Sequence, residues 1–464
     1  MRVGFADPPS FFGGIMEKDT DKKAAREGNL DAPTRHAIPW QDPQFFDATA
    51  INTELYRVFD ICHGCRRCFN LCQAFPTLFD LIDNSSEMEV KSVAPADYSQ
   101  VVDQCYLCDM CYMTKCPYVP PHSWNVDFPH LMLRAKAAKF RAGKTLLRDR
   151  VLTSTDAVGR LAGIPVITQA VNAINRNGAA RKLLKAVLGV DPRAHIPAYH
   201  SQTFRKGWQL PLDREPVATP DTKGQVVLFA TCYGNYNEPG LAADLARVFQ
   251  HNGISVRLAD DERCCGMPKL EVGDLDGVAA LKEFNIPRLA ALVDQGYDII
   301  APVPSCVLMF KQELPLLFPE DAQVAKVKKA IFDPFEYLLL RHKGGQMKTE
   351  FKNQLGKIAY HVPCHLRVQN IGLKTRDVLM MVPGTTVEVI ERCSGHDGTY
   401  GVKSEFYEDA VKIGRPVVKR IEEAAADYFT SDCPIAGHHL AQGMGPDAQP
   451  ISPYALLCRA YGIE

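Results

Sequence analysis

The chain has 464 residues, of which 46% are hydrophobic and 23% are charged. These proportions are typical of soluble globular proteins and exclude a chain that is mainly disordered, fibrous or embedded in a membrane. The length predicts two to four domains. Lys and Arg total 53 against 54 Asp and Glu, so no excess of positive charge indicates nucleic acid as a partner.

The first 50 residues mix proline, glycine, charges and aromatic side chains without a helical or strand period. This composition predicts an irregular arm that packs on its own protein. The chain opens without the basic and apolar segments of a secretory signal peptide, so we expect a cytoplasmic protein with reduced thiols. The nearest candidate for a membrane span, residues 161–175, is short and contains Pro165, so we expect no transmembrane helix.

Sixteen cysteines carry most of the functional information, and eight of them fall in two short runs. The runs are Cys62-x2-Cys65-x2-Cys68-x3-Cys72 and Cys105-x2-Cys108-x2-Cys111-x4-Cys116, the second followed by Pro117. Three cysteines at x2 spacing wrap a short loop around one cubane cluster, and the first run has the spacing of bacterial ferredoxins. The alternative is zinc, but zinc takes four ligands, commonly as two separated pairs, and the runs exceed that need.

Each run supplies three thiolates to one cluster, so the fourth ligand must come from elsewhere. In two-cluster ferredoxins the last cysteine of a run binds the other cluster. We therefore expect two [4Fe-4S] clusters, one on Cys62, Cys65, Cys68 and Cys116 and one on Cys105, Cys108, Cys111 and Cys72. The x4 spacing before Cys116 departs from the pattern by one residue. Residues 51–125, with helical apolar spacing between the runs, are predicted to form an α-helical two-cluster ferredoxin-type domain.

Residues 126–222 are predicted to be a basic helical segment followed by a linker. Between residues 131 and 190, 12 Lys or Arg stand against Asp149 and Asp156, a local balance of +10. The helical pattern breaks at Pro165, and the proline-rich stretch from residue 191 has no period. A basic face is by default solvated. The alternative is that residues 134–185 dock to an acidic partner or to an anionic membrane, which would place the protein peripherally on the inner face of the membrane.

From residue 223 the chain alternates short apolar strands with helices, and the same order occurs twice, in residues 223–345 and 346–464. In the first copy VVLFA precedes Cys232 and YDIIAPV precedes Cys306. In the second copy KIAYHV precedes Cys364, TTVEVIER precedes Cys393 and ADYFTS precedes Cys433. These cysteines follow the carboxyl ends of predicted strands, where open α/β sheets bind ligands.

With these motifs the chain resembles the iron-sulfur subunits related to heterodisulfide reductase, a family that includes subunits of anaerobic glycerol-3-phosphate dehydrogenase and of glycolate oxidase. The resemblance covers about residues 55–464. It implies a ferredoxin-type domain followed by two tandem α/β "CCG" domains, whose pattern is a lone cysteine, then Cys-Cys-Gly, then CxxC.

The first CCG unit matches the family pattern at Cys232, Cys264, Cys265 and Cys306, with Gly266 after the pair and Val303 in place of one cysteine. The resemblance implies a third iron-sulfur cluster on these four thiols. Because the noncubane cluster of heterodisulfide reductases draws on an extra cysteine, an ordinary cubane is the alternative form.

The second CCG unit matches at Cys364, Cys393 and Cys433, but Ser394 replaces the paired cysteine and Thr430 holds the leading CxxC position. Two interpretations stay open. The three thiols bind a metal that is completed by one of His361, His365, His396, His438 and His439, or these groups preserve the turns of a decayed site. Cys458 stands alone and is interpreted as a small buried hydrophobic residue.

The resemblance implies an electron-transfer subunit whose partner is a flavin-linked dehydrogenase of a hydroxy acid or glycerol phosphate. Electrons would leave toward a quinone or another carrier. Two alternatives stay open: an enzyme that reduces a disulfide at the first CCG unit, and an electron donor to a rubrerythrin-type peroxide-reducing protein. No dinucleotide fingerprint follows a strand and no Ser/His/Asp arrangement stands out, so no catalytic residue is assigned.

Overall fold

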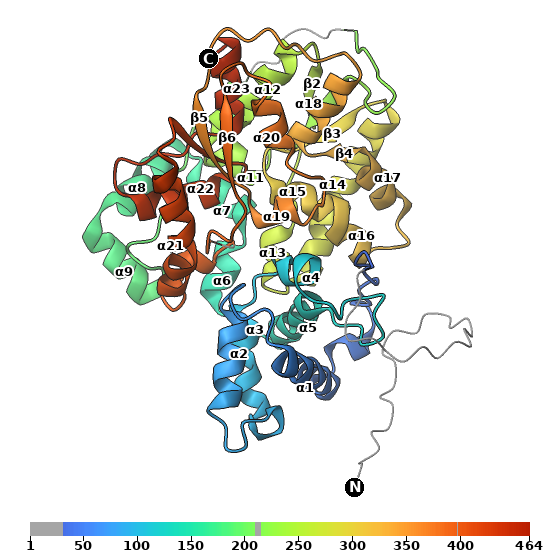
Figure 1. Ribbon diagram of the computed structural model, residues 1–464, viewed down its shortest axis with the longest axis vertical. Coiled ribbons are helices and arrows are strands. Elements are labelled where there is room, and N and C mark those ends of the chain that lie inside the picture. Colours follow the sequence, from blue (N-terminus) through green and yellow to red (C-terminus); the bar gives the residue numbers. More distant parts are fainter. Residues whose placement is uncertain (1–30, 209–214, 397) are drawn as a thin grey trace.

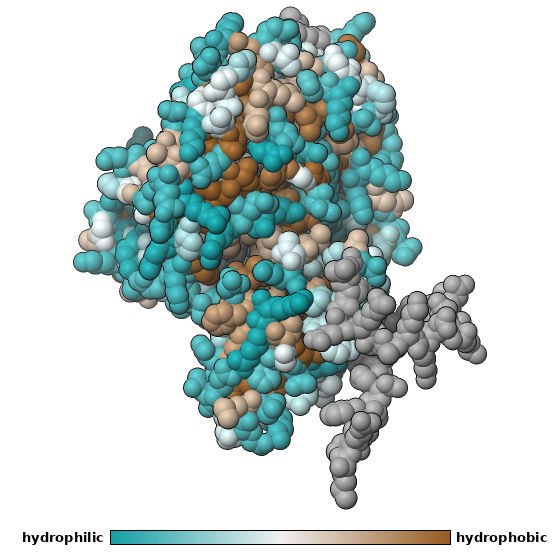
Figure 2. Space-filling view, in the orientation of Figure 1, coloured by the Kyte–Doolittle hydropathy of each residue, from teal (hydrophilic) through white to brown (hydrophobic). Residues whose placement is uncertain are grey.

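The computed structural model describes residues 31–208, 215–396 and 398–464. Along the chain a group of helices is followed by a second helical segment and then by two α/β units. Figure 1 shows the first helices, in blue, at one end of the molecule and the two sheets in the other half. Hydrophilic residues cover most of the face in Figure 2, and the core beneath is built from buried apolar side chains.

The first helices share an aromatic core. They are η1 (Pro43–Phe46), α1 (Ala48–Cys65), α2 (Ala74–Asp83), η2 (Val90–Ser92), η3 (Pro95–Asp97), α3 (Tyr98–Gln104), α4 (Met110–Thr114) and α5 (Phe128–Arg141). Phe59 on α1 and Phe75 on α2 both contact Phe128 on α5, with ring centroids 6.3 and 4.8 Å apart. Asp47 fixes the start of α1, because its side chain accepts a hydrogen bond from the Ala50 N–H at 2.7 Å. This core holds the loops that carry the cysteine runs.

The described part of the N-terminal arm packs on the protein, as its aromatic residues predict. The Ile38 N–H donates to the Leu316 carbonyl at 2.8 Å, and Trp40 Nε1–H donates to the Leu317 carbonyl at 3.0 Å. Both contacts join the arm to the first α/β unit. The rest of the predicted arm, residues 1–30, lies outside the described residues.

The basic segment folds into four short helices, α6 (Leu147–Leu152), α7 (Thr155–Ala162), α8 (Pro165–Arg176) and α9 (Gly178–Leu188). The predicted break lies at Pro165, which occupies the first turn of α8. Proline is tolerated there because a backbone N–H in the first turn has no acceptor within the helix. The α7 and α8 axes bend by 107° at this point. The stretch predicted to be a linker contains α10 (Phe204–Gly207), and the Arg205 N–H donates to Asn235 Oδ1 at 3.0 Å.

The first α/β unit has a four-stranded parallel sheet in the order β2-β1-β3-β4. Its elements are β1 (Gln225–Leu228), α11 (Cys232–Tyr236), α12 (Pro239–His251), β2 (Ser255–Leu258), α13 (Met267–Glu271), α14 (Leu275–Asp294), β3 (Asp298–Ile300), α15 (Pro304–Leu308), the π-helix η4 (Met309–Glu313), α16 (Leu314–Leu317), α17 (Ala322–Ala330), β4 (Ile331–Phe332) and α18 (Pro334–Lys343). Strands β1 and β3 are fully buried apart from Gln225, as the apolar residues that make up most of each strand predict.

The second unit repeats this order with a three-stranded parallel sheet, β6-β5-β7. Its elements are β5 (Lys357–His361), α19 (Cys364–Arg367), α20 (Lys374–Leu379), β6 (Thr386–Ile390), η5 (Tyr400–Val402), α21 (Tyr407–Ala424), β7 (Tyr428–Ser431), α22 (Pro434–Met444) and α23 (Pro453–Tyr461). The sheet order β6-β5-β7 matches β2-β1-β3, so the predicted internal duplication is present in the fold.

The two units exchange their last helices. Helix α23, at the end of the second unit, packs on α12 of the first, while α18, at the end of the first unit, packs on α20 of the second. Helices α12 and α20 occupy equivalent places after the first strand of each unit. The exchange is therefore reciprocal, and each unit completes the core of the other.

Candidate functional site

Four of the predicted cluster ligands line one small cavity. Cys62 and Cys65 lie on the last turn of α1, Cys68 follows in the loop, and Cys116 comes from the second run. The cavity walls include the rings of Phe75, Phe79 and Tyr118. Burial, and then the neighbouring Cys116 and Cys68 sulfurs, raise the pKa of the Cys62 thiol. The structure thus brings together the first set of residues that the crossover pattern predicts.

The cysteines of the second predicted set, Cys72, Cys105, Cys108 and Cys111, also lie close together. Burial raises the pKa of the Cys72 thiol, and the next contributions come from Cys108 and Cys105. Burial and the sulfurs of Cys108, Cys105 and Cys72 likewise raise the pKa of Cys111. Cys72, from the first run, therefore lies among the three cysteines of the second run.

The loop that carries Cys105, Cys108 and Cys111 has an unusual backbone. Leu107 and Asp109 both adopt positive φ, +56° and +61°, a conformation that favours glycine. The buried carboxylate of Asp109 is held by Arg35, whose Nη1 and Nη2 donate to it at 2.5 and 2.8 Å. A bidentate guanidinium–carboxylate pair fixes direction as well as distance. Arg35 from the arm thus holds the loop in this strained conformation.

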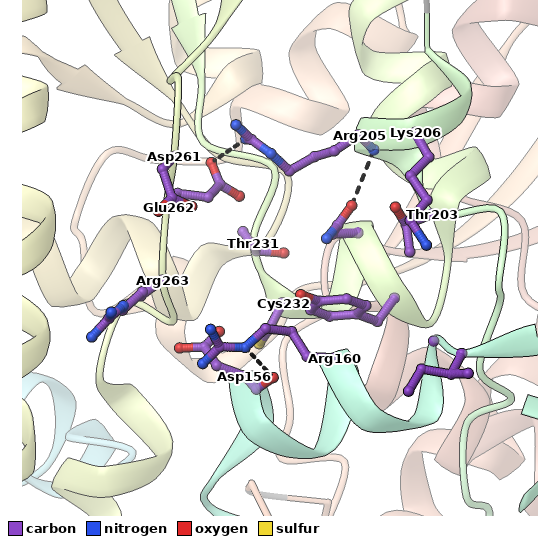
Figure 3. Close-up of a pocket in the computed structure, with 14 residues that line it drawn as sticks. Asp156, Arg160, Thr203, Arg205, Lys206, Thr231, Cys232, Asp261, Glu262 and Arg263 are labelled. Carbon is purple, nitrogen blue, oxygen red and sulfur yellow. Dashed lines mark hydrogen bonds and ion pairs between the residues drawn. The ribbon is translucent and has the colours of Figure 1, made fainter. Parts of the chain in front are cut away.

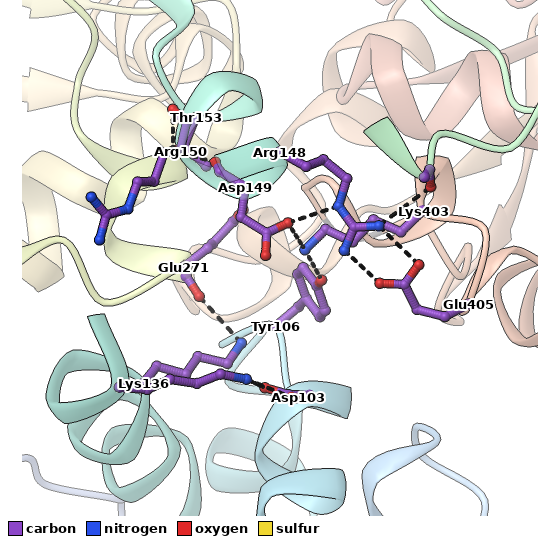
Figure 4. A network of polar contacts seen from close by, with 12 residues as sticks. Asp103, Tyr106, Lys136, Arg148, Asp149, Arg150, Thr153, Glu271, Lys403 and Glu405 are labelled. Atoms are coloured by element: carbon purple, nitrogen blue, oxygen red, sulfur yellow. Dashed lines mark hydrogen bonds and ion pairs between the residues drawn. The ribbon is translucent and has the colours of Figure 1, made fainter. Parts of the chain in front are cut away.

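A buried lysine stands beside this second set (Figure 4). Lys136 Nζ on α5 donates to the Cys105 carbonyl, and also to the Glu271 carbonyl at 3.2 Å. Burial lowers the pKa of Lys136 below its ordinary value, and the nearby Cys105 sulfur offsets only part of this shift. Nearby, Lys403 Nζ donates to the Tyr106 hydroxyl at 2.8 Å and lies 2.9 Å from Asp149. These contacts join the helices that carry the cysteine runs to both α/β units.

The four cysteines of the first α/β unit converge below the carboxyl ends of its strands. Hydrogen bonds from the Cys232 and Cys265 thiols lower the pKa of Cys264 well below its ordinary value, which favours a thiolate there. Cys265 also contacts Cys306, so the four sulfurs form one group. Cys264, Cys265 and Cys306 are buried, and Cys232 is half-buried.

Local structure explains why the Cys-Cys-Gly sequence turns here. Gly266 adopts φ +103°, which only glycine reaches without strain, and caps the start of α13. Asn285 Nδ2 donates to the Cys264 carbonyl at 3.0 Å, and its Oδ1 accepts from the Arg263 N–H at 3.0 Å. The Cys264 N–H donates to Asp156 Oδ2 on α7 at 2.8 Å. Helices α14 and α7 thereby fix the pair from two sides.

The second unit brings together two of its three cysteines. Cys364 is buried and its thiol contacts both Cys393 and Cys108, the latter from the second run. Cys433 starts α22 and has other neighbours: burial raises its pKa to about 11, while the N–H groups of Ala436 and Ile435 lower it. Cys364 and Cys393 therefore lie against the second set of cysteines, and Cys433 interacts with a different part of the molecule.

The histidines of the second unit have separate environments. Both nitrogens of His361 are used, with Ser431 Oγ and the Arg392 carbonyl each at 3.0 Å. His365 Nδ1 lies 2.7 Å from Ser305 Oγ, and His438 Nε2 lies 2.5 Å from Glu238. Burial, with His439 next, lowers the pKa of His396 to about 3. Within the described residues, no three Cys, His, Asp or Glu side chains converge as ligands of a single metal ion.

An open cavity of about 320 Å³ reaches the half-buried Cys232 (Figure 3). Its charged wall includes Arg205, which pairs with Glu262 at 3.3 Å. Thr231, at the turn before Cys232, has φ +67°, and its hydroxyl accepts the Gly234 N–H at 3.1 Å to cap α11. A β-branched residue at positive φ is strained, and such strain clusters at functional sites. No sequence pattern indicated this cavity, because its lining comes from separate segments: α7 and the bend after it, α10, α11 and the loop after β2.

The donor sets fit iron-sulfur clusters. Each of the first two sets contains four sulfurs from two separate runs, and the first unit supplies four more. Soft thiolates are the ligands that such clusters take, and coordination removes the thiol proton. For three of the predicted cysteine sets, the positions of the sulfurs and their chemistry therefore both fit a bound iron-sulfur cluster.

Comparison with known proteins supports this chemistry. A family model for the CCG cysteine-rich domain matches residues 226–311 and 358–441. One of the subunits of anaerobic glycerol-3-phosphate dehydrogenase from Escherichia coli is 31% identical over 314 residues, which are 67% of this chain and 76% of the relative. The chain belongs to the CCG-domain family related to heterodisulfide reductase. The two α/β units are its two CCG domains.

More distant relatives agree with this assignment. One of the subunits of the dihydromethanophenazine:CoB–CoM heterodisulfide reductase of Methanosarcina mazei is 28% identical over 286 residues, 58% of this chain and 66% of the relative. Lactate utilization protein A of Halalkalibacterium halodurans is 25% identical over 214 residues, 45% of this chain and 85% of the relative. The chain is thus an oxidoreductase subunit of the iron-sulfur type. The predicted resemblance and the pair of CCG domains are confirmed.

In the described ranges no single helix is long and apolar enough to cross a membrane. Helices α7 and α8 together have the length and composition of a membrane span, but they are bent by 107°.

Proposed function

We propose that this protein is an electron-transfer subunit with two [4Fe-4S] clusters between α1 and α5, in a ferredoxin-type domain near residues 51–125. The observation that carries the proposal is the crossover of the two runs. Cys116 lines the cavity of Cys62, Cys65 and Cys68, and Cys72 lies among the cysteines of the other run. The two sets are neighbours, because the Cys68 sulfur of the first set also raises the pKa of Cys111 in the second, so two cubanes bound here would exchange single electrons.

A third iron-sulfur cluster is proposed on Cys232, Cys264, Cys265 and Cys306. The convergence of these four sulfurs into one group supports it. Val303 is buried at the position of the missing CxxC cysteine, which favours a four-ligand cubane over a noncubane form. Residues 126–222 then serve as the connection that braces this site, since α7 contributes Asp156 to it.

We assign the second CCG domain to the surroundings of the second cluster rather than to a separate metal. The contact of Cys364 with Cys108 supports this assignment, as does the different position of Cys433. Replacement of Cys393 by Ser tests it. Unchanged iron and zinc content is expected, and loss of a metal other than iron would restore the separate site on Cys364, Cys393 and Cys433.

The proposed partner is a flavin-linked dehydrogenase of the hydroxy-acid or glycerol-phosphate type, and the proposed acceptor is a quinone. The relatives support a dehydrogenase partner, since two of them are named as a subunit of a glycerol-3-phosphate dehydrogenase and as a lactate utilization protein. The clusters would supply one-electron chemistry, and the partner would oxidise the organic substrate.

An exposed apolar surface on α6–α9 supports a peripheral position on the inner face of a membrane. Fifteen large apolar side chains are exposed in the described chain, and nine of them lie in this segment: Leu146, Leu147, Val151, Leu161, Ile164, Val166, Ile174, Leu183 and Val187. Basic residues such as Lys182 and Lys185 lie among them on α9. Apolar side chains flanked by Lys and Arg are the pattern of an interfacial membrane surface.

Two other functions make different predictions. A disulfide-reducing enzyme would turn over a disulfide with reduced protein alone, at the Cys232 site. A donor to a rubrerythrin-type protein would support peroxide reduction only when that protein is added. The electron-transfer proposal expects no turnover until a dehydrogenase is present, and then reduction of a quinone. Disulfide turnover by the isolated protein would contradict it.

A further inference from the structure

The cavity beside Cys232 has two unlike walls. One wall carries the hydrogen-bond donors Arg205 and Lys206 on α10, beside the acidic side chains of Asp261 and Glu262. The other is formed by Gly163 and Ile164, at the bend between α7 and α8, and by the side chain of Tyr236, with Arg160 and Asp156 of α7 next to Cys232. The floor is Cys232 itself. At about 320 Å³ the cavity is at the small end of the range for sites that hold a small molecule.

The apolar wall is continuous with the exposed surface on α6–α9. Ile164 lines the cavity and is also one of the nine exposed apolar side chains, with 48% of its surface accessible. Val166, two residues further along, is 77% exposed. A molecule that lies in a membrane against α8 would therefore meet the cavity first at the apolar side chain of Ile164.

The polar wall has unused capacity. Arg205 Nη1 is buried and makes no hydrogen bond within the described residues, although it lies 3.3 Å from a Glu262 oxygen. Its Nη2 donates to the Ala259 carbonyl, which fixes the plane of the guanidinium. Figure 3 shows the arginine and Glu262 at one side of the cavity, with Cys232 and Asp156 at the other. An acceptor oxygen on a ligand would add a directional hydrogen bond to the ion pair that this nitrogen makes with Glu262.

We propose that this cavity binds the head group of a membrane quinone. A flat ring with two carbonyl oxygens needs an apolar wall, hydrogen-bond donors at its edge, access from the lipid and a neighbouring electron donor, and the cavity has each of these. The inference rests on the proposed function, because the electrons arrive through the cysteine site of the first CCG domain.

The reaction balances without a further reagent. A cluster held by Cys232 and its three partners would supply two electrons, one at a time, and water in the open cavity would supply two protons. The product is the quinol, in which each carbonyl oxygen has become a hydroxyl group. The residues of the cavity orient the ring and exclude lipid; the electrons originate in the substrate of the partner dehydrogenase.

Binding of a quinone analogue tests the site directly. We would titrate the anaerobically purified protein with 2-heptyl-4-hydroxyquinoline N-oxide and follow the quenching of the fluorescence of the probe. Ile164→Trp fills the mouth at an exposed position, and Lys206→Met removes one exposed donor. Met380→Trp, on the second CCG domain and 53% exposed, is the matched control.

The expected result is saturable binding that weakens at least tenfold in Ile164→Trp and several-fold in Lys206→Met, with no change in Met380→Trp. Absence of binding to the unmodified protein, equal affinities in all variants, or displacement of the probe by inorganic phosphate would overturn the quinone site. Iron content, measured on the same samples, separates the two failures: clusters without probe binding leave the proposed electron-transfer function standing, whereas protein without iron removes both.

Discussion

Phe335 and Tyr454 stack face to face, with ring centroids 5.2 Å apart and planes 12° from parallel. Each follows the first proline of a helix, Phe335 in α18 and Tyr454 in α23. The two residues hold equivalent positions in the two CCG domains, so they meet where the exchanged helices approach each other. Both rings are buried.

This stack should couple the stability of the two domains. Phe335→Ala and Tyr454→Ala are each expected to lower the free energy of unfolding by about 3–5 kcal/mol, the usual loss for a buried aromatic side chain. In a double-mutant cycle measured by urea denaturation, the double variant should lose about 1 kcal/mol less than the sum of the two single losses. Strict additivity would show that the rings do not stabilise each other.

Lys136 should raise the reduction potential of the cluster proposed on Cys105 and its partners. Its ammonium group is buried beside the Cys105 carbonyl, and a nearby cation favours the more negative, reduced state. Lys136→Met is expected to lower the midpoint potential by roughly 50–100 mV in a redox titration followed by electron paramagnetic resonance.

The matched control for this change is Lys139→Met on the same helix. Lys139 is half-exposed and pairs with Asp103 at 2.8 Å, so solvent screens its charge. Its midpoint potential should stay within the error of the titration. An equal shift in both variants would mean that the effect is general and does not come from the buried ammonium.

His130 should make stability depend on pH. Burial and the nearby Arg35 lower its pKa, but the carboxylates of Asp127 and Glu313, at 3.1 and 3.5 Å, outweigh them and raise it to about 9. A histidine with a raised pKa stabilises the fold fully below the unfolded pKa of about 6.5, and this stabilisation is lost as the pH rises through about 9.

The expected loss between pH 6.5 and 9 is about 2–3 kcal/mol at most. It should appear as a falling midpoint of denaturation, and His130→Gln should flatten that slope. The exposed His200, replaced in the same way, is the control. A slope that survives in His130→Gln would assign the pH dependence to other groups.

The sequence predicted the elements of the CCG domains well, because local pattern decides them. The run VVLFA, residues 226–230, includes all of β1 except Gln225. The break in the helical pattern at Pro165 could also be predicted, because proline disfavours a helical conformation of the residue before it. Cysteine spacing predicted which thiols meet within each run and across the two runs.

Contacts between distant segments were not predictable in this way. No local pattern indicates that Cys364 lies against Cys108, or that α18 and α23 exchange places. One of the two interpretations of Cys364, Cys393 and Cys433, that they share a metal site, treated the second CCG domain alone. The structure instead places Cys364 and Cys393 against Cys108 of the second cysteine run, because packing between distant segments decides which thiols meet.

The apolar surface on α9 should bind anionic vesicles. Leu183→Glu and Val187→Glu, one turn apart and 64% and 72% exposed, are expected to weaken cosedimentation with phosphatidylglycerol vesicles at least tenfold. Met380→Glu should bind like the unmodified protein, and raised salt should weaken binding by screening Lys182 and Lys185. No sedimentation with vesicles at low salt would remove the membrane surface.

The most direct test of the account is the iron and acid-labile sulfide content per chain of anaerobically purified protein, with electron paramagnetic resonance of the reduced state. The account predicts about twelve irons, about eight in Cys264→Ser, and about twelve in Cys458→Ser, whose buried thiol lies in α23. About eight irons that do not change in Cys264→Ser would contradict the third cluster. Bound zinc, or four irons or fewer, would contradict the electron-transfer function itself.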